Sequence, residues 1–212
     1  MYPSPRPRRR LASAILGGLA LCAADAPCAL AQTAAAQSPF AVESRGLTVG
    51  LSHFGPRDEF GDSFRDIDIT TLDMAIGWRL VSGIEVRAIA SAVVARGERA
   101  EPFDPAPPRD SDAEGIALGG GLRYHLELTE TVDLFAEGAI QFMWTAGTPF
   151  PAGGTGVNGL TRWGGGVAVD ITPRLTVEAA YLRTHVSNGG GMVDWNPAWN
   201  GHGLSVGVRM SF

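Results

Sequence analysis

The chain has 212 residues, with 17 basic and 22 acidic side chains and a formal net charge of −5 at pH 7. This acidic balance argues against a nucleic-acid partner, and the length suits one domain behind a leader segment.

The first 31 residues have the three parts of a secretory signal peptide. Four arginines within residues 6–10 form a basic start, residues 11–24 are apolar without an acidic side chain, and residues 29–31 read Ala-Leu-Ala. This pattern predicts export and cleavage after residue 31. The apolar run is too short for a spanning helix. A lipoprotein would be modified at Cys22, but the bulky Leu21 before it fits that signal poorly.

Removal of the signal peptide changes what the mature chain can do. Cys22 and Cys28 leave with it, so no disulfide, thiolate nucleophile or cysteine metal site remains. The mature part keeps 13 basic and 21 acidic residues, a net charge of −8. Residues 32–44, rich in Ala, Gln and Ser, are expected to form a flexible lead, and residues 45–212 one domain. No later stretch could cross a bilayer as a helix, so membrane insertion would require strands.

From residue 46 onward, apolar residues alternate with small or polar ones at a period of two. This alternation predicts eight strands of about ten residues, the length of a tilted transmembrane strand. One parity is apolar, and the other carries Gly, Ser and occasional Arg, Glu and Gln. The expected strands are centred on residues 46–54, 72–78, 84–90, 118–126, 134–144, 163–169, 175–181 and 204–212.

The connections alternate between short and long. Short turns are expected at 80–82, 128–130 and 172–173, and long connections at 55–67, 96–114, 145–158 and 187–201. This alternation is typical of outer-membrane barrels, which have short periplasmic turns and long outer loops. The chain ends on Phe212, like the terminal signature that the outer-membrane assembly machinery recognises. We therefore predict an all-β, eight-stranded antiparallel barrel in the outer membrane. A periplasmic β-sandwich is the alternative.

Several candidate motifs have structural explanations. The glycine triplets at 119–121 and 164–166 lie within strands, where glycine permits curvature, and no helix follows to cradle a phosphate. The acidic residues of segment 58–68 lack the spacing of a calcium-binding loop and are expected to be solvated. His53 and His125 stand near strand ends, where a structural or solvated role is expected.

One stretch can carry chemistry. His185 and Ser187 are two residues apart, so on a continuing strand they face the same side, which is the expected lipid side. Their Cα atoms would lie about 6.5–7 Å apart, and a histidine base with a serine nucleophile is the pairing used in acyl transfer. The alternative is that the strand has left the membrane at His185, so that these polar residues only face water.

The sequence His185-x-Ser187-Asn188, followed by Asn196-Pro197 and a final strand to Phe212, resembles the lipid A 3-O-deacylase (acyloxyacyl hydrolase) family. The resemblance is specific over residues 183–212. It implies an outer-membrane esterase that removes the 3-linked acyl chain of lipid A, and so remodels lipopolysaccharide in the outer leaflet, without a cofactor or metal.

The resemblance also implies roles for residues. Ser187 would be the nucleophile and His185 the general base, with Asn200 at the third triad position. Candidates for the oxyanion hole are Asn188, the backbone at Gly189, and Asn196.

The chain departs from the family at two positions. Family members often carry Glu where this chain has the neutral Asn200, and Gly where it has Ala198. Asn200 can still accept a hydrogen bond from a ring nitrogen but cannot stabilise an imidazolium by charge. Asp194 could orient His185 instead, and His202 is a lower-ranked alternative base.

Four aromatic residues are expected near the level of this pair, as an interfacial belt or as walls of an acyl groove: Trp163, Tyr181, Trp195 and Trp199. The alternative function is a non-catalytic small barrel, adhesin-like or structural, or a deacylase homologue that has lost activity. A general porin is disfavoured because side chains fill the interior of an eight-stranded barrel.

Overall fold

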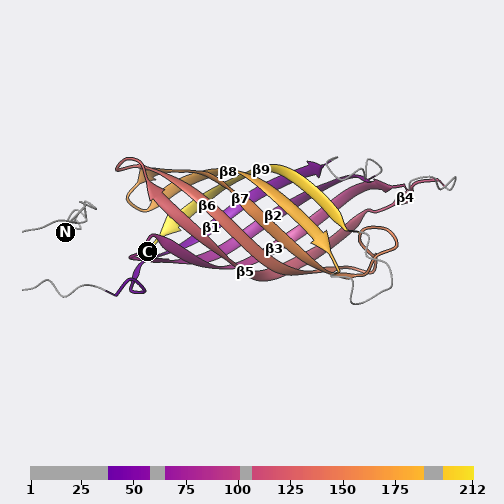
Figure 1. Cartoon of the computed structure of the whole chain (residues 1–212), viewed down its shortest axis with the longest axis horizontal. Coiled ribbons are helices and arrows are strands. Elements are labelled where there is room, and N and C mark those ends of the chain that lie inside the picture. Colours follow the sequence, from indigo (N-terminus) through magenta and orange to yellow (C-terminus); the bar gives the residue numbers. More distant parts are fainter. Residues whose placement is uncertain (1–37, 58–64, 101–106, 189–197) are drawn as a thin grey trace, which may run out of the picture. The chain divides into compact units, whose positions relative to one another are not determined.

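The computed structural model describes residues 38–57, 65–100, 107–188 and 198–212. They form one antiparallel sheet that closes on itself, because β1 pairs with both β2 and β9 and β2 also pairs with β3 (Figure 1). The strands are β1 Val42–Pro56, β2 Arg65–Leu80, β3 Ile84–Arg99, β5 Ala113–Glu127, β6 Val132–Thr145, β7 Val157–Thr172, β8 Leu175–Ser187 and β9 Trp199–Ser211, with a two-residue β4, Arg109–Asp110, beside β3. The predicted eight-stranded antiparallel barrel is confirmed.

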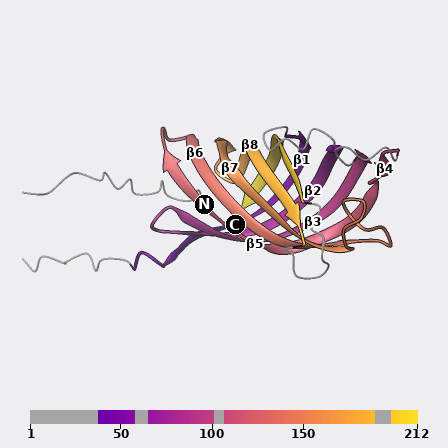
Figure 2. The same cartoon turned by 45° about the vertical axis from the view of Figure 1, so that its right-hand side comes forward.

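The two ends of the barrel differ as the sequence predicted. The short-turn end carries the turns 81–83, 128–131 and 173–174, together with the start of β1 and the end of β9. The opposite, long-loop end carries the longer connections. The strands are tilted relative to the long axis of the barrel (Figures 1 and 2).

The strands are longer than predicted. Apart from the two-residue β4 they have 13 to 16 residues, so the expected loops at 55–67, 96–114, 145–158 and 187–201 are partly strand. β1 also begins at Val42, inside the segment expected to be a flexible lead. Strand pairing continues beyond the apolar belt because inward-facing apolar side chains stabilise it. For example, Ile69 on β2 is fully buried opposite Ala95 on β3.

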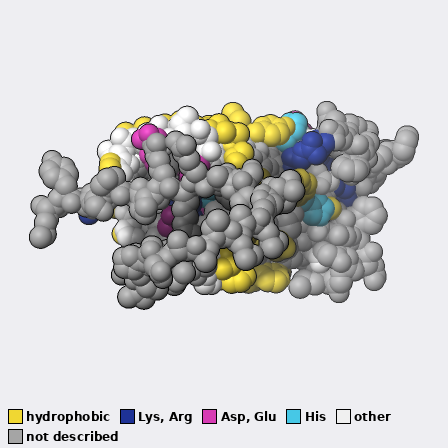
Figure 3. All heavy atoms as spheres, turned by 60° about the vertical axis from the view of Figure 1, so that its left-hand side comes forward, with side chains coloured by type: hydrophobic (Ala, Val, Ile, Leu, Met, Phe, Trp, Pro, Cys, Tyr) yellow, Lys and Arg dark blue, Asp and Glu magenta, His cyan; other side chains and the backbone are white. Residues whose placement is uncertain are grey.

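An apolar belt surrounds the middle of the barrel. Outward-facing residues such as Leu72, Met74 and Ile116 expose about half of their surface. Figure 3 shows part of this belt in yellow, with Arg and His side chains beside it. On β5, the belt runs from Ile116 to Leu126, which corresponds to roughly 25 Å along the membrane normal for a strand tilted by about 40°. That height matches the hydrocarbon core.

The polarity of the two faces reverses near the long-loop end. On β2, Leu72 and Met74 face outward and Asp73 inward, whereas beyond Thr71 the exposed residue is Asp68 and the buried one is Ile69. β5 changes likewise between Ile116 and Glu114. This reversal marks where each strand leaves the apolar belt, and we call it the belt boundary.

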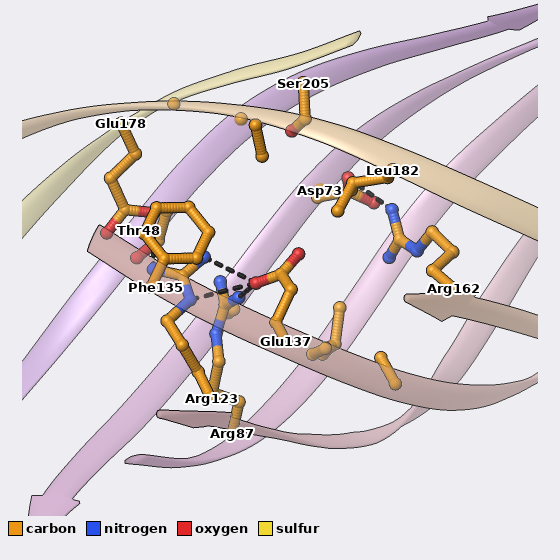
Figure 4. Close-up of a pocket in the computed structure, with 16 residues that line it drawn as sticks. Thr48, Asp73, Arg87, Arg123, Phe135, Glu137, Arg162, Glu178, Leu182 and Ser205 are labelled. Carbon is orange, nitrogen blue, oxygen red and sulfur yellow. Dashed lines mark hydrogen bonds and ion pairs between the residues drawn. The ribbon is translucent and has the colours of Figure 1, made fainter. Parts of the chain in front are cut away.

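At the level of the belt, the interior is a polar network (Figure 4). The Arg123 guanidinium lies 2.7 Å from both Glu137 and Glu178, and Arg162 lies 2.7 Å from Asp73. These groups line a cavity of about 40 Å³, which has room for a few water molecules only. This cavity is therefore too small to hold a lipid chain.

Above the belt boundary, the interior becomes apolar, a change that the alternation of the sequence had not predicted. Phe54, Ile67, Phe150 and Val186 are fully buried there, and so is Trp199. The prediction that Trp199 belongs to an interfacial aromatic belt or to the wall of an acyl groove is therefore wrong, because the odd-numbered residues of β9 face the interior. Trp163 and Tyr181 do face outward and are about half exposed.

None of the residues that the structure describes belongs to a helix long and apolar enough to cross a membrane.

Candidate active site

β8 places the predicted catalytic pair on the outer surface of the barrel. Thr184 and Val186 are buried in the interior, so the alternating His185 and Ser187 project outward, and both are half-buried. The shared face that the spacing predicted is thus present. The pair stands just beyond the belt boundary, where the outward residues of β8 change from Tyr181 to polar side chains.

Strand register brings Asn200 to His185. The two residues are direct partners between β8 and β9, and Nδ1 of His185 lies 2.7 Å from Oδ1 of Asn200. An amide oxygen only accepts hydrogen bonds, so with this amide orientation the proton resides on Nδ1. The lone pair is then on Nε2. This is the tautomer in which a histidine can act as a base through Nε2.

β7 forms the other side of the site. Thr161 stands opposite His185, and its hydroxyl donates to the His185 carbonyl oxygen at 3.4 Å. Gly159 stands opposite Ser187. Among the described residues, a Cβ atom added at Gly159 would meet only the Ser187 carbonyl oxygen, at an ordinary 3.5 Å. None of the described side chains therefore covers Gly159 beside the serine.

Two further rows of outward residues connect this site to the apolar belt. The first consists of Trp163, Arg183 and His202, and the second of Gly165, Tyr181 and Leu204, each row crossing β7, β8 and β9 in register. The rings of Tyr181 and His202 are 5.9 Å apart. From Tyr181, a shallow apolar groove extends over the lipid-facing side of the sheet, lined by residues that include Leu134, Val167, Ala179, Leu204 and Val206.

The remaining predicted residues are only partly described. Asn188 directly follows Ser187 and is half-buried. Gly189, Asp194 and Asn196 lie outside the described residues, as does Trp195. His202 is exposed one row nearer the membrane than His185, opposite Arg183.

Three further neighbours of the site were not predicted from the sequence: Gly159, Thr161 and Arg183. The first two are on another strand, and their position follows only from the register of β7 against β8. Arg183 could have been noticed as a charged residue on the apolar parity of β8. His53 and His125 were expected to be structural or solvated: His125 is buried, with Nε2 2.9 Å from Glu85, and the exposed His53 ring contacts Thr70.

Within the described part of the chain, no three His, Cys, Asp or Glu side chains come together as a metal site would require.

No protein-family model matches the chain, and no curated protein matches it in sequence. Among solved structures, Neisserial surface protein A (NspA) aligns with a TM-score of 0.55 at 14% identity, covering 79% of this chain and 97% of NspA. The outer-membrane enzyme PagL aligns with a TM-score of 0.53 at 13% identity, covering 76% of this chain and 97% of PagL. At such low identity these matches show a shared fold, the small outer-membrane barrel, and that fold serves both an enzyme and a surface protein.

Proposed function

We propose that this protein is an outer-membrane serine esterase that hydrolyses the 3-O-linked acyl chain of lipid A. The observation that carries the proposal is the hydrogen bond between Nδ1 of His185 and Oδ1 of Asn200, beside Ser187 on the outer surface of the barrel. With the amide of Asn200 oriented in this way, the bond supports the tautomer that a general base requires.

In the proposed reaction, Nε2 of His185 takes the proton of the Ser187 hydroxyl as its oxygen attacks the ester carbonyl carbon. The negative charge of the tetrahedral intermediate develops on the former carbonyl oxygen, for which Asn188, the Gly189 backbone and Asn196 remain the candidate donors. The protonated His185 then donates to the departing sugar oxygen. Water, activated by the same ring, releases the acyl group from Ser187.

The position of the pair suits a substrate that stays in the membrane. An ester of lipid A lies where the headgroup sugars meet the acyl chains, and His185 and Ser187 stand just beyond the apolar belt. The interior cavity of about 40 Å³ cannot admit an acyl chain. The apolar groove below Tyr181 offers a surface along which a chain could lie while its ester remains at the site.

The proposal includes the route to the membrane. A signal peptide over residues 1–31 would direct export, and Phe212 would be read by the assembly machinery. Phe212 is 74% exposed, and its backbone N–H donates to the Arg45 carbonyl oxygen, so the side chain is presented at the end of β9.

The decisive experiment is mass spectrometry of lipid A from cells expressing the wild type, Ser187→Ala or His185→Asn. We expect the wild type alone to remove one hydroxyacyl chain. His53→Asn is the matched control, because His53 also projects from the outer surface but contacts Thr70 instead. Its spectrum should match that of the wild type.

Folding of every variant is checked by the heat-dependent shift of its electrophoretic mobility. Identical spectra from wild type and Ser187→Ala, with both folded in the outer membrane, would favour the non-catalytic barrel. Loss of activity in His202→Asn with activity retained in His185→Asn would transfer the role of base to His202.

A further inference from the structure

Arg183 is a charged residue in an unusual position. It projects outward from β8 between Tyr181 and His185, in the row where the apolar belt ends, and it is exposed. A charged side chain on the lipid-facing surface is costly at mid-membrane and tolerated near the interface. A long arginine at this boundary directs its guanidinium toward the headgroups.

The barrel offers a direct comparison at the same boundary. Arg96 on β3 also faces outward just beyond the belt, and its guanidinium lies 2.5 Å from Glu114 and 3.7 Å from Asp112. Arg183 has no ion pair with any residue in the described ranges. Its register partners are instead Trp163 on β7 and His202 on β9. The charge of Arg96 is balanced within the protein, whereas that of Arg183 is available to a ligand.

We propose that Arg183 and His202 bind a phosphate group on the headgroup of the glycolipid whose ester is cleaved. This inference rests on the proposed function and adds the chemistry by which the headgroup is recognised. A guanidinium offers two parallel N–H donors to a phosphate, and either neutral tautomer of His202 keeps one N–H to donate. The contact of the His202 ring with Tyr181, at 5.9 Å between centroids, restricts its orientation.

The position favours the substrate itself over a neighbouring phospholipid. The row of Arg183 and His202 is adjacent to the row of His185 and Asn200, so the two are separated by about 7 Å along the strands. A phosphate held by Arg183 therefore belongs to the molecule whose headgroup covers the site. Such binding would orient that headgroup and bring its ester toward Ser187.

The test measures binding instead of hydrolysis. The full-length mature chain carrying Ser187→Ala is folded in detergent micelles and titrated with lipid A, either phosphorylated or enzymatically dephosphorylated with the same acyl chains. Native mass spectrometry gives the bound fraction. We expect at least tenfold tighter binding of the phosphorylated form.

Arg183→Gln in the same background should remove this preference, and His202→Asn should reduce it. The matched control is Arg96→Gln, which should keep the full preference because Arg96 is already paired with Glu114. An undiminished preference in Arg183→Gln would overturn the assignment. A second outcome would also overturn it: phosphatidylglycerol binds as tightly as lipid A, and Arg183→Gln weakens the binding of both lipids equally. Arg183 and His202 would then hold the phosphate of any lipid.

The outcome is separable from that of the esterase proposal. Suppose that binding prefers phosphorylated lipid A and depends on Arg183, but that lipid A in cells is unchanged. This result would refute the esterase and support headgroup recognition. Hydrolysis that depends on Ser187, without any phosphate preference, would refute only the present inference.

Discussion

Replacing Asn200 by Asp tests the hydrogen bond on which the site is built. The two side chains have the same shape, so Oδ1 can stay 2.7 Å from Nδ1 of His185 while the partner gains a negative charge. A neutral hydrogen bond contributes about 0.5–1.5 kcal/mol and one to a charged group about 1.5–3 kcal/mol. The imidazolium of the transition state should thus be stabilised by about 1 kcal/mol more, which corresponds to a five- to tenfold rise in kcat/KM.

The converse change, Asn200→Ala, should lower kcat/KM by a similar factor, because the ring loses the partner that fixes its tautomer. Asn200→Glu should hold or raise activity if the longer side chain reaches Nδ1. The assay is release of hydroxy fatty acid from micellar lipid A by the purified, folded barrel. Equal or lower activity in Asn200→Asp, with His185→Asn inactive, would show that Asn200 does not orient the base and would favour Asp194 or no third member.

Three further predictions concern access, interior charge and strand packing. Gly159→Leu should lower lipid A hydrolysis at least tenfold by covering Ser187. Gly159→Ala, for which the structure has space, should retain activity, and lipid A mass spectra compare the two variants. Arg123→Ala removes the ion-pair partner of the buried Glu178 and leaves the half-buried Glu137 with Arg87 alone. It should lower the free energy of unfolding by about 3–5 kcal/mol, measured by urea titration in vesicles, and an unchanged transition would contradict the network. Gly203→Ala should prevent closure of β1 against β9, since a Cβ there collides with the His53 carbonyl oxygen, while Gly138→Ala, with nothing within 4 Å, should fold normally on heat-shift gels.

The sequence was sufficient to predict the barrel within the membrane. Alternation on strands such as β5 and β6 predicts one apolar face, and the alternation of short and long connections favours an outer-membrane barrel over a sandwich. The ends of the strands were not predictable in this way. At Ile67 and Ile69 the apolar residues change from the outer to the inner face of β2. A strand prediction that requires one apolar parity therefore ends at this reversal, before the strand itself ends.

The same reversal explains the error at Trp199. A tryptophan near the membrane edge suggests an interfacial position, but the parity of β9 directs Trp199 into the apolar interior of the long-loop end. For the site, spacing predicted the common face of His185 and Ser187. The contact of His185 with Asn200 joins β8 to the neighbouring β9. It depends on the register between these two strands, and only the family resemblance suggested this pairing.

The reversal of polarity around the ring has a mechanical consequence. A shift of the barrel by one residue pair along its strands would carry Arg96, Glu114 and Asp68 into hydrocarbon, so the protein is held at one depth. Hydrophobic mismatch with a thinner or thicker bilayer must then be absorbed by the surrounding lipid. His185 and Asn200 are fixed to this frame, so for the proposed esterase the deformation of the surrounding lipid sets the height of the imidazole relative to the acyl esters. Activity in reconstituted membranes should therefore pass through an optimum as lipid chain length is varied.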